Sequence, residues 1–505
     1  MQQQHQRVQA RARYVELAAA ASGASRLRSR SPVSGLDRRR LGPLQVLGQS
    51  VSGAAPTAAM AATPAIAAAT AGQAAIWSFL VATGLALLIG SCIGHFTRRM
   101  AVAGSLYSLT AKGLGPVGGL ACGVALLIGY GFLTMAGLVG SATYLTTLFS
   151  HFGVPAAVMT GGFVALLTAV LGALAVVLIR RGVRLSARVV LTVEALAITL
   201  MLLIFTVLLV RNGSTIHRFG VPPLQLRGVA AGVLPALGAF IGFEAAAALG
   251  VEARRPFSTI PKAVRWTAAA CGLLYLFAVY VQQLEFADIP GGLAGQSQPL
   301  NVLAAAQHMP WLSSLLDAGI TMSFFAAALA AGTALVRVLF SMGREGVAPQ
   351  AMGRTHRRYR TPNIAVVTSL PVATAVPVLL LLAAGMSPAE ALLVLLNTSV
   401  FGYLVAYLLV CLAAPRFLHR IGELTIGPVL ATAVVAPVLL TVLAFFVVSQ
   451  WGSATPIAWL LIAAAAAAWF GWLRLRRPQC LGVIGVYDET SAADLLGAPD
   501  ENTRP

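Results

Sequence analysis

The stretch GAFIGFE, residues 238–244, interrupts an apolar segment that runs from about residue 228 to residue 251. Its two glycines weaken a helix, and Glu244 places a carboxylate near the middle of the segment. An apolar segment of about 20 residues is long enough to cross a bilayer, so the interruption falls at mid-membrane depth. Unwound backbone and an ionisable side chain are costly at that depth, and together they indicate a functional site.

The composition of the whole chain indicates an all-α polytopic membrane protein. Of its 505 residues 58% are hydrophobic and only 10% are charged, and the mean hydropathy is +0.82. Soluble domains carry about a quarter charged residues. The formal net charge of +19 would suggest nucleic acid as a partner of a soluble protein. Here the basic residues fall in short clusters between apolar segments, so we predict a lipid bilayer as the partner and no nucleic acid.

About twelve apolar segments are long enough to be transmembrane helices. They cover roughly residues 43–69, 73–96, 117–149, 155–179, 187–210, 228–251, 262–286, 311–340, 363–384, 388–413, 425–449 and 455–473. The membrane domain is therefore predicted at 43–477. The basic stretch 1–42 is predicted to be an unstructured tail, with a helix on the lipid surface as the alternative, and 478–505 a short solvated tail. The amino terminus lacks a signal-peptide pattern, so insertion is expected to begin with the first span.

Basic residues recur in every second loop between these segments, and this pattern predicts the orientation. Arginine-rich loops face the cytoplasm, so both termini are expected inside a bacterial cytoplasmic membrane. The loop after the fifth span is the exception, with Arg211, Arg218 and Arg227. The seven cytoplasmic clusters lie before span one and after spans two, four, six, eight, ten and twelve: Arg38–Arg40, Arg98–Lys112, Arg180–Arg184, Arg254–Lys262, Arg344–Arg360, Arg416–Arg420 and Arg474–Arg477.

A second interruption lies in the first span, where SVSGAAP at residues 50–56 places small residues and a proline at mid-membrane depth. Spans one and six are five apart, as an inverted repeat of five plus five helices requires. Broken helices at matching positions of two halves indicate a transporter's substrate site, because they free backbone groups for a ligand. The alternative is that glycine and proline only permit kinks and close packing. The matched pair favours the site.

Two carboxylates, Glu244 and Glu194, lie well inside predicted spans, whereas Asp317 and Glu390 lie nearer the outer ends of theirs. We expect Glu244 and Glu194 to take part in proton coupling. The alternative is a neutral acid hydrogen-bonded to a neighbouring helix. Ser387 and Glu390 form a predicted capping box, which makes Glu390 structural. Tyr130 can either line a central cavity or pack helices together. No HExxH, GxSxG, P-loop or CxxC pattern is present, so we predict no enzyme, no cofactor and no metal site.

Three segments of the chain resemble those of the amino acid–polyamine–organocation superfamily, specifically its bacterial amino acid permeases. AGSLYS at 103–108, followed by Gly115-Pro116, is similar to the family's AGGxYxY…LGP loop. FIGFE at 240–244, continuing to EARRP at 252–256 and Ile260-Pro261, resembles its FxGFE…EExxNPxxxIP signature. RVL at 337–339 with GREGVAP at 343–349, then Thr361-Pro362, resembles its RxLYxMxRDGxxP ending. The Ser52…Pro56 pattern also fits the family's first span.

The resemblance implies the LeuT-type fold, with ten core helices plus two, and transport by alternating access. It implies that Glu244 corresponds to a carboxylate that takes part in proton sensing in some relatives. Where relatives often carry an aromatic gate, this chain has Gly238, and where some carry a lysine in span five it has Glu194. The substrate-binding residues that the resemblance implies are Ser50, Val51, Ser52, Gly53, Gly238, Phe240, Ile241, Gly242 and Phe243.

These observations predict a secondary transporter of an amino acid or related amine, coupled to protons, with sodium as the alternative ion. A substrate–product exchanger is the second hypothesis. A membrane receptor that binds substrate without transport is the third, because Gly238 departs from the family's gate. A membrane-embedded enzyme is disfavoured by the lack of a catalytic set.

Overall fold

The computed structural model describes residues 31–489 except for 156, 212–223, 288, 290, 297–298, 307–309 and 452–454. Within these residues the chain is helical, and its one β-bridge is an isolated pair between Leu41 and Ala253. The elements are α2 (Pro43–Gly53), α3 (Pro56–Ala71), η1 (Gly72–Ala74), α4 (Ala75–Thr97), α5 (Ser105–His151), α6 (Gly161–Arg181), α7 (Val183–Arg211), α8 (Leu226–Gly238), η3 (Ala245–Leu249), α9 (Pro256–Glu285), η4 (Leu293–Gly295), α10 (Pro299–Ala306), α11 (Pro310–Arg344), η5 (Gln350–Gly353), α12 (Asn363–Leu382), α13 (Pro388–Arg420), α14 (Ile426–Ser449), α15 (Thr455–Arg476) and α16 (Pro478–Leu481).

The predicted all-α membrane architecture is confirmed. Nine stretches of the described chain are long and apolar enough to cross a membrane, and one of them, Pro43–Thr97, contains both of the first two predicted spans. The first half of the predicted sixth span is the shorter helix α8. Its second half differs from an α-helix, because it forms a turn and the 3₁₀ segment η3.

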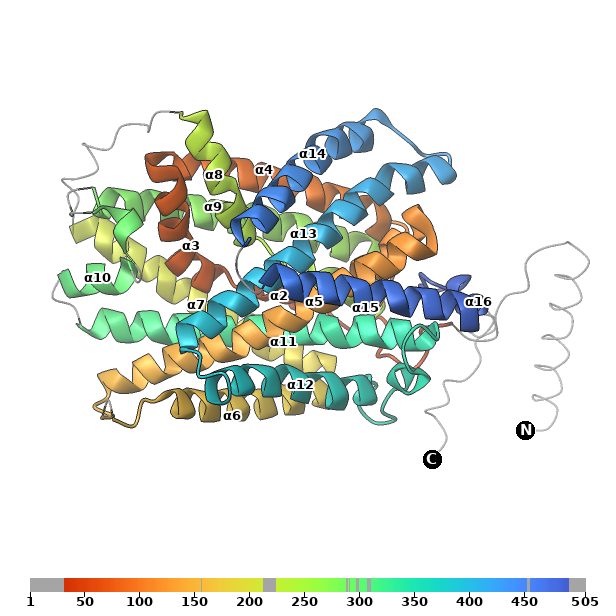
Figure 1. Ribbon diagram of the computed structural model, residues 1–505, viewed down its shortest axis with the longest axis horizontal. Helices are drawn as coiled ribbons and strands as arrows, with labels where there is room; N and C mark the ends of the chain where they lie inside the picture. The colour runs from red at the N-terminus through yellow and green to blue at the C-terminus, as the bar shows by residue number, and fades with distance from the viewer. Residues whose placement is uncertain are drawn as a thin grey trace, which may run out of the picture.

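The helix α5 runs through the centre of the molecule and packs most extensively against α13 and α11 (Figure 1). Figure 1 shows α6 and α12 side by side along one edge, and the two helices are in contact. The short helix α2 packs against α9, α3 packs against α9, α4 and α8, and α8 packs against α4. The two interrupted spans therefore meet inside the bundle, between the long helices, rather than at its lipid-facing surface.

The loops that carry the predicted basic clusters lie together at one end of the bundle, which we call the basic end. Arg99 pairs with Glu423, and the Arg420 guanidinium donates to the Lys112 carbonyl. The Thr361 hydroxyl donates to the Arg180 carbonyl at 3.0 Å. This bond joins the end of α6 to the residues just before α12. The alternation of charge along the sequence is therefore an alternation between the two ends of one bundle.

The structure describes residues 31–42 and 478–489 of the two predicted tails, and residues of both stretches pack onto the bundle. Residues 31–41 pack onto the basic end through Val33, Leu36 and Leu41, which are 1%, 3% and 0% exposed. Backbone hydrogen bonds to Glu252 hold Leu41 and its neighbour Arg40 there. These few apolar residues suffice because the bundle already provides a surface for them. The remainder of the predicted tails, 1–30 and 490–505, lies outside the described residues.

A buried ion pair joins two of the motifs that resemble the permease family. Arg337 of α11 and Glu252, which follows η3, are 2% and 1% exposed, and Arg337 Nη2 lies 2.7 Å from Glu252 Oε1. The guanidinium also donates through Nε to the same oxygen at 3.0 Å and through Nη1 to the Thr333 carbonyl. This pair fixes the end of the sixth span to α11. The predicted capping box is confirmed as well, with Ser387 and Glu390 bonded reciprocally at the start of α13.

We predict that Glu252→Gln destabilises the protein by about 3–5 kcal/mol, because it leaves a buried guanidinium without its counter-charge. The apparent melting temperature of the purified protein in detergent, followed by size-exclusion fluorescence, measures the effect. The matched control is Glu423→Gln, whose partner Arg99 is at the surface, where an ion pair contributes about 0–1 kcal/mol. Equal melting temperatures for the two variants would contradict the structural role of the buried pair.

Candidate substrate site between two broken helices

The first break separates α2 from α3. The helix α2 ends at Gly53, and Ala55 adopts a left-handed conformation with φ 45° before Pro56 begins α3. Proline is suited to the first position of a helix because it has no N–H to leave unpaired. The predicted residues Ser50, Val51, Ser52 and Gly53 form the last turn of α2.

The second break lies between α8 and η3. The helix α8 ends at Gly238, and residues 239–244 form turns in which Gly242 has φ +84°. Only glycine adopts this conformation without strain. The predicted residues Phe240, Ile241, Gly242, Phe243 and Glu244 all lie in this non-helical segment.

The two breaks touch each other through their glycines. A Cβ added to Gly53 would lie 2.3 Å from the Gly242 carbonyl oxygen, and one added to Gly242 would lie 2.3 Å from the Gly53 carbonyl oxygen. Ser50 Oγ donates to the Phe243 carbonyl at 2.7 Å and accepts from Ala246 N–H at 3.2 Å. One serine of the first break thus binds backbone groups on both sides of Glu244.

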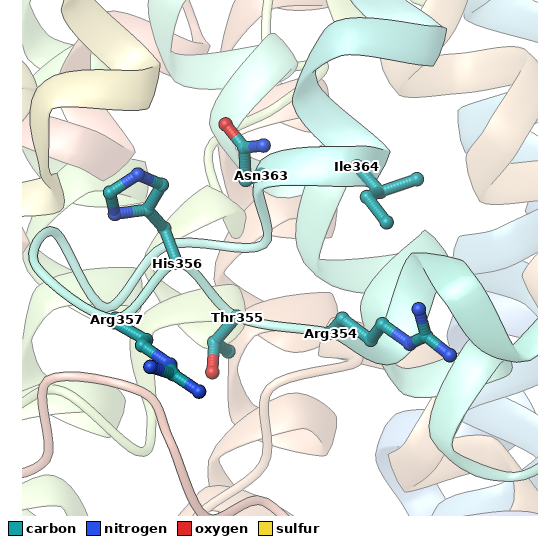
Figure 2. Close-up of a pocket in the computed structure, with 6 residues that line it drawn as sticks. All are labelled: Arg354, Thr355, His356, Arg357, Asn363 and Ile364. Atoms are coloured by element: carbon teal, nitrogen blue, oxygen red, sulfur yellow. The ribbon is translucent and has the colours of Figure 1, made fainter.

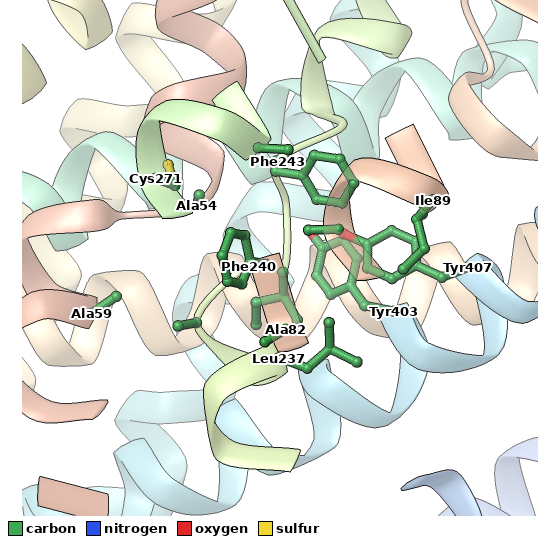
Figure 3. Packing of buried hydrophobic residues seen from close by; sticks show 14 of the residues in the cluster. Ala54, Ala59, Ala82, Ile89, Leu237, Phe240, Phe243, Cys271, Tyr403 and Tyr407 are labelled. Atoms are coloured by element: carbon green, nitrogen blue, oxygen red, sulfur yellow. The ribbon is translucent and has the colours of Figure 1, made fainter. Parts of the chain in front are cut away.

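A tyrosine from α9 contacts backbone carbonyls of both breaks. Tyr275 Oη lies 2.8 Å from the Ala239 carbonyl oxygen and 3.4 Å from the Ala54 carbonyl oxygen. Its ring packs edge-to-face on Phe240, with centroids 5.0 Å apart. Figure 3 shows Phe240 and Ala54 near this junction, with Phe243, Tyr403 and Tyr407 grouped beside it. Carbonyls released by unwinding are therefore bound by a buried hydroxyl.

Glu244 is fully buried and binds two tyrosines from two different helices. Tyr130 of α5 donates to Oε1 at 2.9 Å, and Tyr407 of α13 donates to Oε2. The Tyr407 hydroxyl also accepts the Gly242 N–H at 3.0 Å. Ser105, at the start of α5, lies 2.9 Å from the Tyr130 hydroxyl. The carboxylate is thereby connected through one hydroxyl to the backbone of the second break.

The other predicted residues occupy different places. Ser52 Oγ points to the Val190 carbonyl of α7, 3.3 Å away, so it faces a neighbouring helix. Glu194 of α7 accepts from Ser323 Oγ of α11 at 3.0 Å, and Ser323 Oγ also accepts the Ala58 N–H of α3. The structure thus brings Glu244 into the second break but places Glu194 beside the start of α3. Each carboxylate has its own set of hydrogen-bond partners.

The sequence leaves the role of Tyr130 open, and no local pattern in it distinguishes Tyr275 or Tyr407. The structure gives each of these tyrosines a hydrogen bond at the breaks. A buried tyrosine hydroxyl usually finds a partner, so tyrosines inside apolar spans were the available signal. Their partners could not be assigned, because the pairs are separated by 36 to 221 residues along the chain.

Two surface cavities of about 400 and 350 Å³ lie at the basic end, and residues of the loop before α12 line both of them. The larger is lined by Arg354, Thr355, His356, Arg357, Asn363 and Ile364 (Figure 2). The smaller is lined by residues that include Arg181, Arg188 and Arg358. Neither cavity includes a residue of the two breaks, so we place the candidate substrate site at the breaks on their geometry alone.

Paired breaks at matching positions, with a buried carboxylate in the second, lie in a helical bundle whose described residues include nine stretches long and apolar enough to cross a membrane. This is a multi-pass membrane architecture. The amino acid permease family matches residues 41–473, which is most of the chain. The chain therefore belongs to the amino acid permease family. The match includes both breaks, Glu244, Glu194 and the buried pair of Arg337 with Glu252.

Among characterised relatives, the chain is 26% identical over 309 residues to the branched-chain amino acid permease BcaP of Bacillus subtilis, covering 59% of this chain and 65% of that protein. It is 28% identical over 284 residues to the low-affinity putrescine importer PlaP of Escherichia coli, covering 54% and 60%. These matches span less than two thirds of the relatives' length.

The fold is that of solved transporters. The structure of MhsT in complex with L-phenylalanine superposes with a TM-score of 0.54 at 14% identity, covering 85% of this chain and 99% of that one. The manganese transporter of Eremococcus coleocola superposes with a TM-score of 0.50 at 13% identity, covering 86% and 95%. The predicted LeuT-type fold class is confirmed by this likeness.

We predict that Gly53→Ala destabilises the protein by about 1–3 kcal/mol, because its Cβ meets the Gly242 carbonyl at 2.3 Å and forces the breaks apart. Gly238→Ala is the matched control, since the nearest atom to its Cβ is Val400 Cγ2 at 3.8 Å. Melting of the two purified variants in detergent compares them. A Gly238→Ala variant as unstable as Gly53→Ala would show that the close approach of the breaks is not the cause.

Proposed function

We propose that this protein is a secondary transporter of an amino acid or related amine that works by alternating access and is coupled to protons through Glu244. The observation that carries the proposal is the connection from Glu244 through the Tyr407 hydroxyl to the Gly242 N–H. It joins the one buried carboxylate of the break to the backbone that a substrate would meet.

The hydrogen bonds supply the coupling step. As a carboxylate, Glu244 accepts from both Tyr130 and Tyr407. A protonated Glu244 has a hydrogen to donate. When it donates this hydrogen to the Tyr407 hydroxyl, that hydroxyl turns its own hydrogen to another acceptor. Tyr407 already accepts the Gly242 N–H, and a change at its hydroxyl reaches the break directly. Proton binding thereby alters the backbone groups that are available to substrate.

The substrate is inferred from the groups that the site presents. Both carboxylate oxygens of Glu244 are engaged by tyrosines, and Phe240, Phe243 and Tyr275 make the surroundings apolar and aromatic. A neutral amino acid, whose backbone ammonium and carboxylate can bind carbonyls and N–H groups of the unwound segments, suits this site best. A cationic amine becomes the better fit if Tyr407 releases Glu244. Relatives named for branched-chain amino acids and for putrescine represent the two classes.

We place the protein in a bacterial cytoplasmic membrane with the basic end in the cytoplasm, because arginine-rich loops are retained on that side. Ser31 and Asp488 are described residues near the two ends of the chain, and they are hydrogen-bonded to each other at the basic end. We therefore assign both termini to the cytoplasm. Glu194 is proposed as a second protonation site. It contacts α11 directly and α3 through Ser323, and a sodium ion is the alternative occupant of this position.

The test is uptake of labelled L-leucine, L-phenylalanine, L-arginine and putrescine into proteoliposomes, with and without an inward proton gradient. Glu244→Gln is expected to lower gradient-driven uptake at least about tenfold while the protein keeps its melting temperature, because glutamine cannot bind and release the proton. Glu390→Gln is the matched control, since Glu390 is a capping residue at the start of α13.

The outcomes separate the hypotheses. Gradient-stimulated uptake that Glu244→Gln abolishes supports proton-coupled transport. Uptake that requires substrate inside the vesicle and ignores the gradient identifies an exchanger and removes Glu244 from coupling. Binding of a panel compound without flux identifies a receptor.

A further inference from the structure

The chain after α16 returns to the basic end and inserts between other segments there. We call residues 484–488 the strap. The Glu345 carboxylate, at the end of α11, accepts the backbone N–H groups of Gly485 at 2.9 Å and Val486 at 2.7 Å, both through Oε1. Its other oxygen accepts the Tyr107 hydroxyl of α5. Glu345 is 2% exposed, so the carboxylate is enclosed by its donors.

The last residue of the strap, Asp488, binds both sides of the basic end. Its backbone N–H donates to the Ala101 carbonyl at 2.8 Å, in the loop before α5. Its carboxylate accepts from Ser31 Oγ at 2.8 Å and lies 2.8 Å from Arg38 Nη2. The Asp488 side chain is 4% exposed. Ser31 and Arg38 lie about 450 residues away in the sequence.

The strap is shaped to fit its position. Gly485 has φ +93°, and a Cβ there would lie 3.1 Å from Ala111 Cβ and 3.3 Å from the Ser108 carbonyl, so glycine allows the close approach to α5. Val486 packs on an apolar cluster that draws on several segments. The cluster comprises Val33, Leu36, Ala103, Val251 and Phe340. The Lys112 ammonium lies over the Tyr487 ring, 4.9 Å from its centroid.

These contacts connect two groups of elements. One group leads into the broken spans: residues 31–41 continue directly into α2 and form backbone hydrogen bonds with residues 251–254 after η3. The other group is the start of α5 and the end of α11, which pack against each other along the bundle. The strap binds the first group through Ser31 and Arg38, and the second through Ala101 and Glu345.

We propose that the strap is an autoinhibitory latch: by tying the entry to the broken helices to α5 and α11, it holds the basic end of the transporter closed until it detaches. This inference rests on the transport function proposed above. In this proposal, substrate leaves at this end when the segments before α2 and after η3 move away from α11. The strap contacts both these segments and α11 across the boundary between them, so its contacts with one of the two sides must break first.

The latch also explains why acidic residues lie in an otherwise basic surrounding. The Asp488 carboxylate binds Ser31 and Arg38 of the first group, and the Glu345 carboxylate of the second group accepts from the strap. Charge-assisted hydrogen bonds of this kind are roughly twice as strong as neutral ones. The ion pair of Arg337 with Glu252 crosses the same boundary deeper in the bundle and remains when the strap detaches. The strap is therefore an added restraint on a boundary that has its own closing contact.

Cys480 is a natural reporter of strap detachment. It is half-buried in α16, and a Cβ on Gly346 would lie 2.9 Å from its sulfur. The other four cysteines, Cys92, Cys122, Cys271 and Cys411, are buried in spanning helices. The rate at which a charged maleimide alkylates the folded full-length protein therefore measures access to Cys480, and Cys480→Ser gives the background.

The first measurement compares alkylation of Asp488→Asn and Gly485→Ala with the wild type. We expect about tenfold faster labelling in both, because one loses the ionic contact to Arg38 and the other cannot adopt the close-packed φ of Gly485. Glu423→Gln is the control, an acidic residue of the basic end that contacts Arg99 rather than the strap. Unchanged labelling in both strap variants overturns the latch.

The second measurement is the exchange rate, in proteoliposomes, of whichever panel compound the wild type carries. A latch predicts that Asp488→Asn and Gly485→Ala exchange several times faster than wild type, while Glu423→Gln does not. Faster labelling with unchanged exchange would show a strap that detaches without controlling transport, and this result overturns the proposal. Absence of flux in the wild type contradicts the proposed function instead, and the labelling rates still report the strap.

Discussion

The satisfaction of backbone polar groups inside the bilayer is the constraint on which this structure depends. Unwinding two spans at mid-membrane releases N–H and C=O groups where there is no water to bind them, and each unpaired group costs several kcal/mol. Ser50, Tyr275 and Tyr407 bind these groups from three different elements. The breaks persist because side chains bind their released backbone groups, and the glycines let the two breaks approach closely enough for Ser50 of the first to bind the backbone of the second.

The same constraint links chemistry to conformation. The Tyr407 hydroxyl that accepts the Gly242 N–H also donates to Glu244, so the protonation state of a side chain and the hydrogen bonding of a backbone segment share one oxygen. A hydroxyl has one hydrogen to donate, and a change at one partner must be felt at the other. At the basic end, two buried carboxylates also connect segments to α11. Glu252, which follows the second break, binds Arg337 of α11, and Glu345 at the end of α11 binds the strap.

The sequence predicted the spans, the two breaks and the carboxylate at the second break, because each is a local property of composition. It did not indicate the contacts that the described residues near the two chain ends make. Residues 31–41 and the strap have the composition of tails, yet they pack, because Val33, Leu36 and Val486 find an apolar surface that other segments build. The sequence also could not identify the hydrogen-bond partners of Glu244. Tyr130 and Tyr407 are separated from it by 114 and 163 residues, and nothing local in either span indicates the pairing.

The sequence by itself therefore determined that this chain crosses a membrane many times. It also determined where the helices break and which loops between spans carry the positive charge. These features follow from hydropathy, glycine and proline placement and charge, which act within a segment of about 20 residues. The tertiary structure alone decided which hydroxyls hold the breaks, that Glu194 lies apart from Glu244, and that the two ends of the chain meet at Asp488. Those contacts depend on how helices distant in sequence cross in space, and hydrogen-bond geometry is specified only once they have packed.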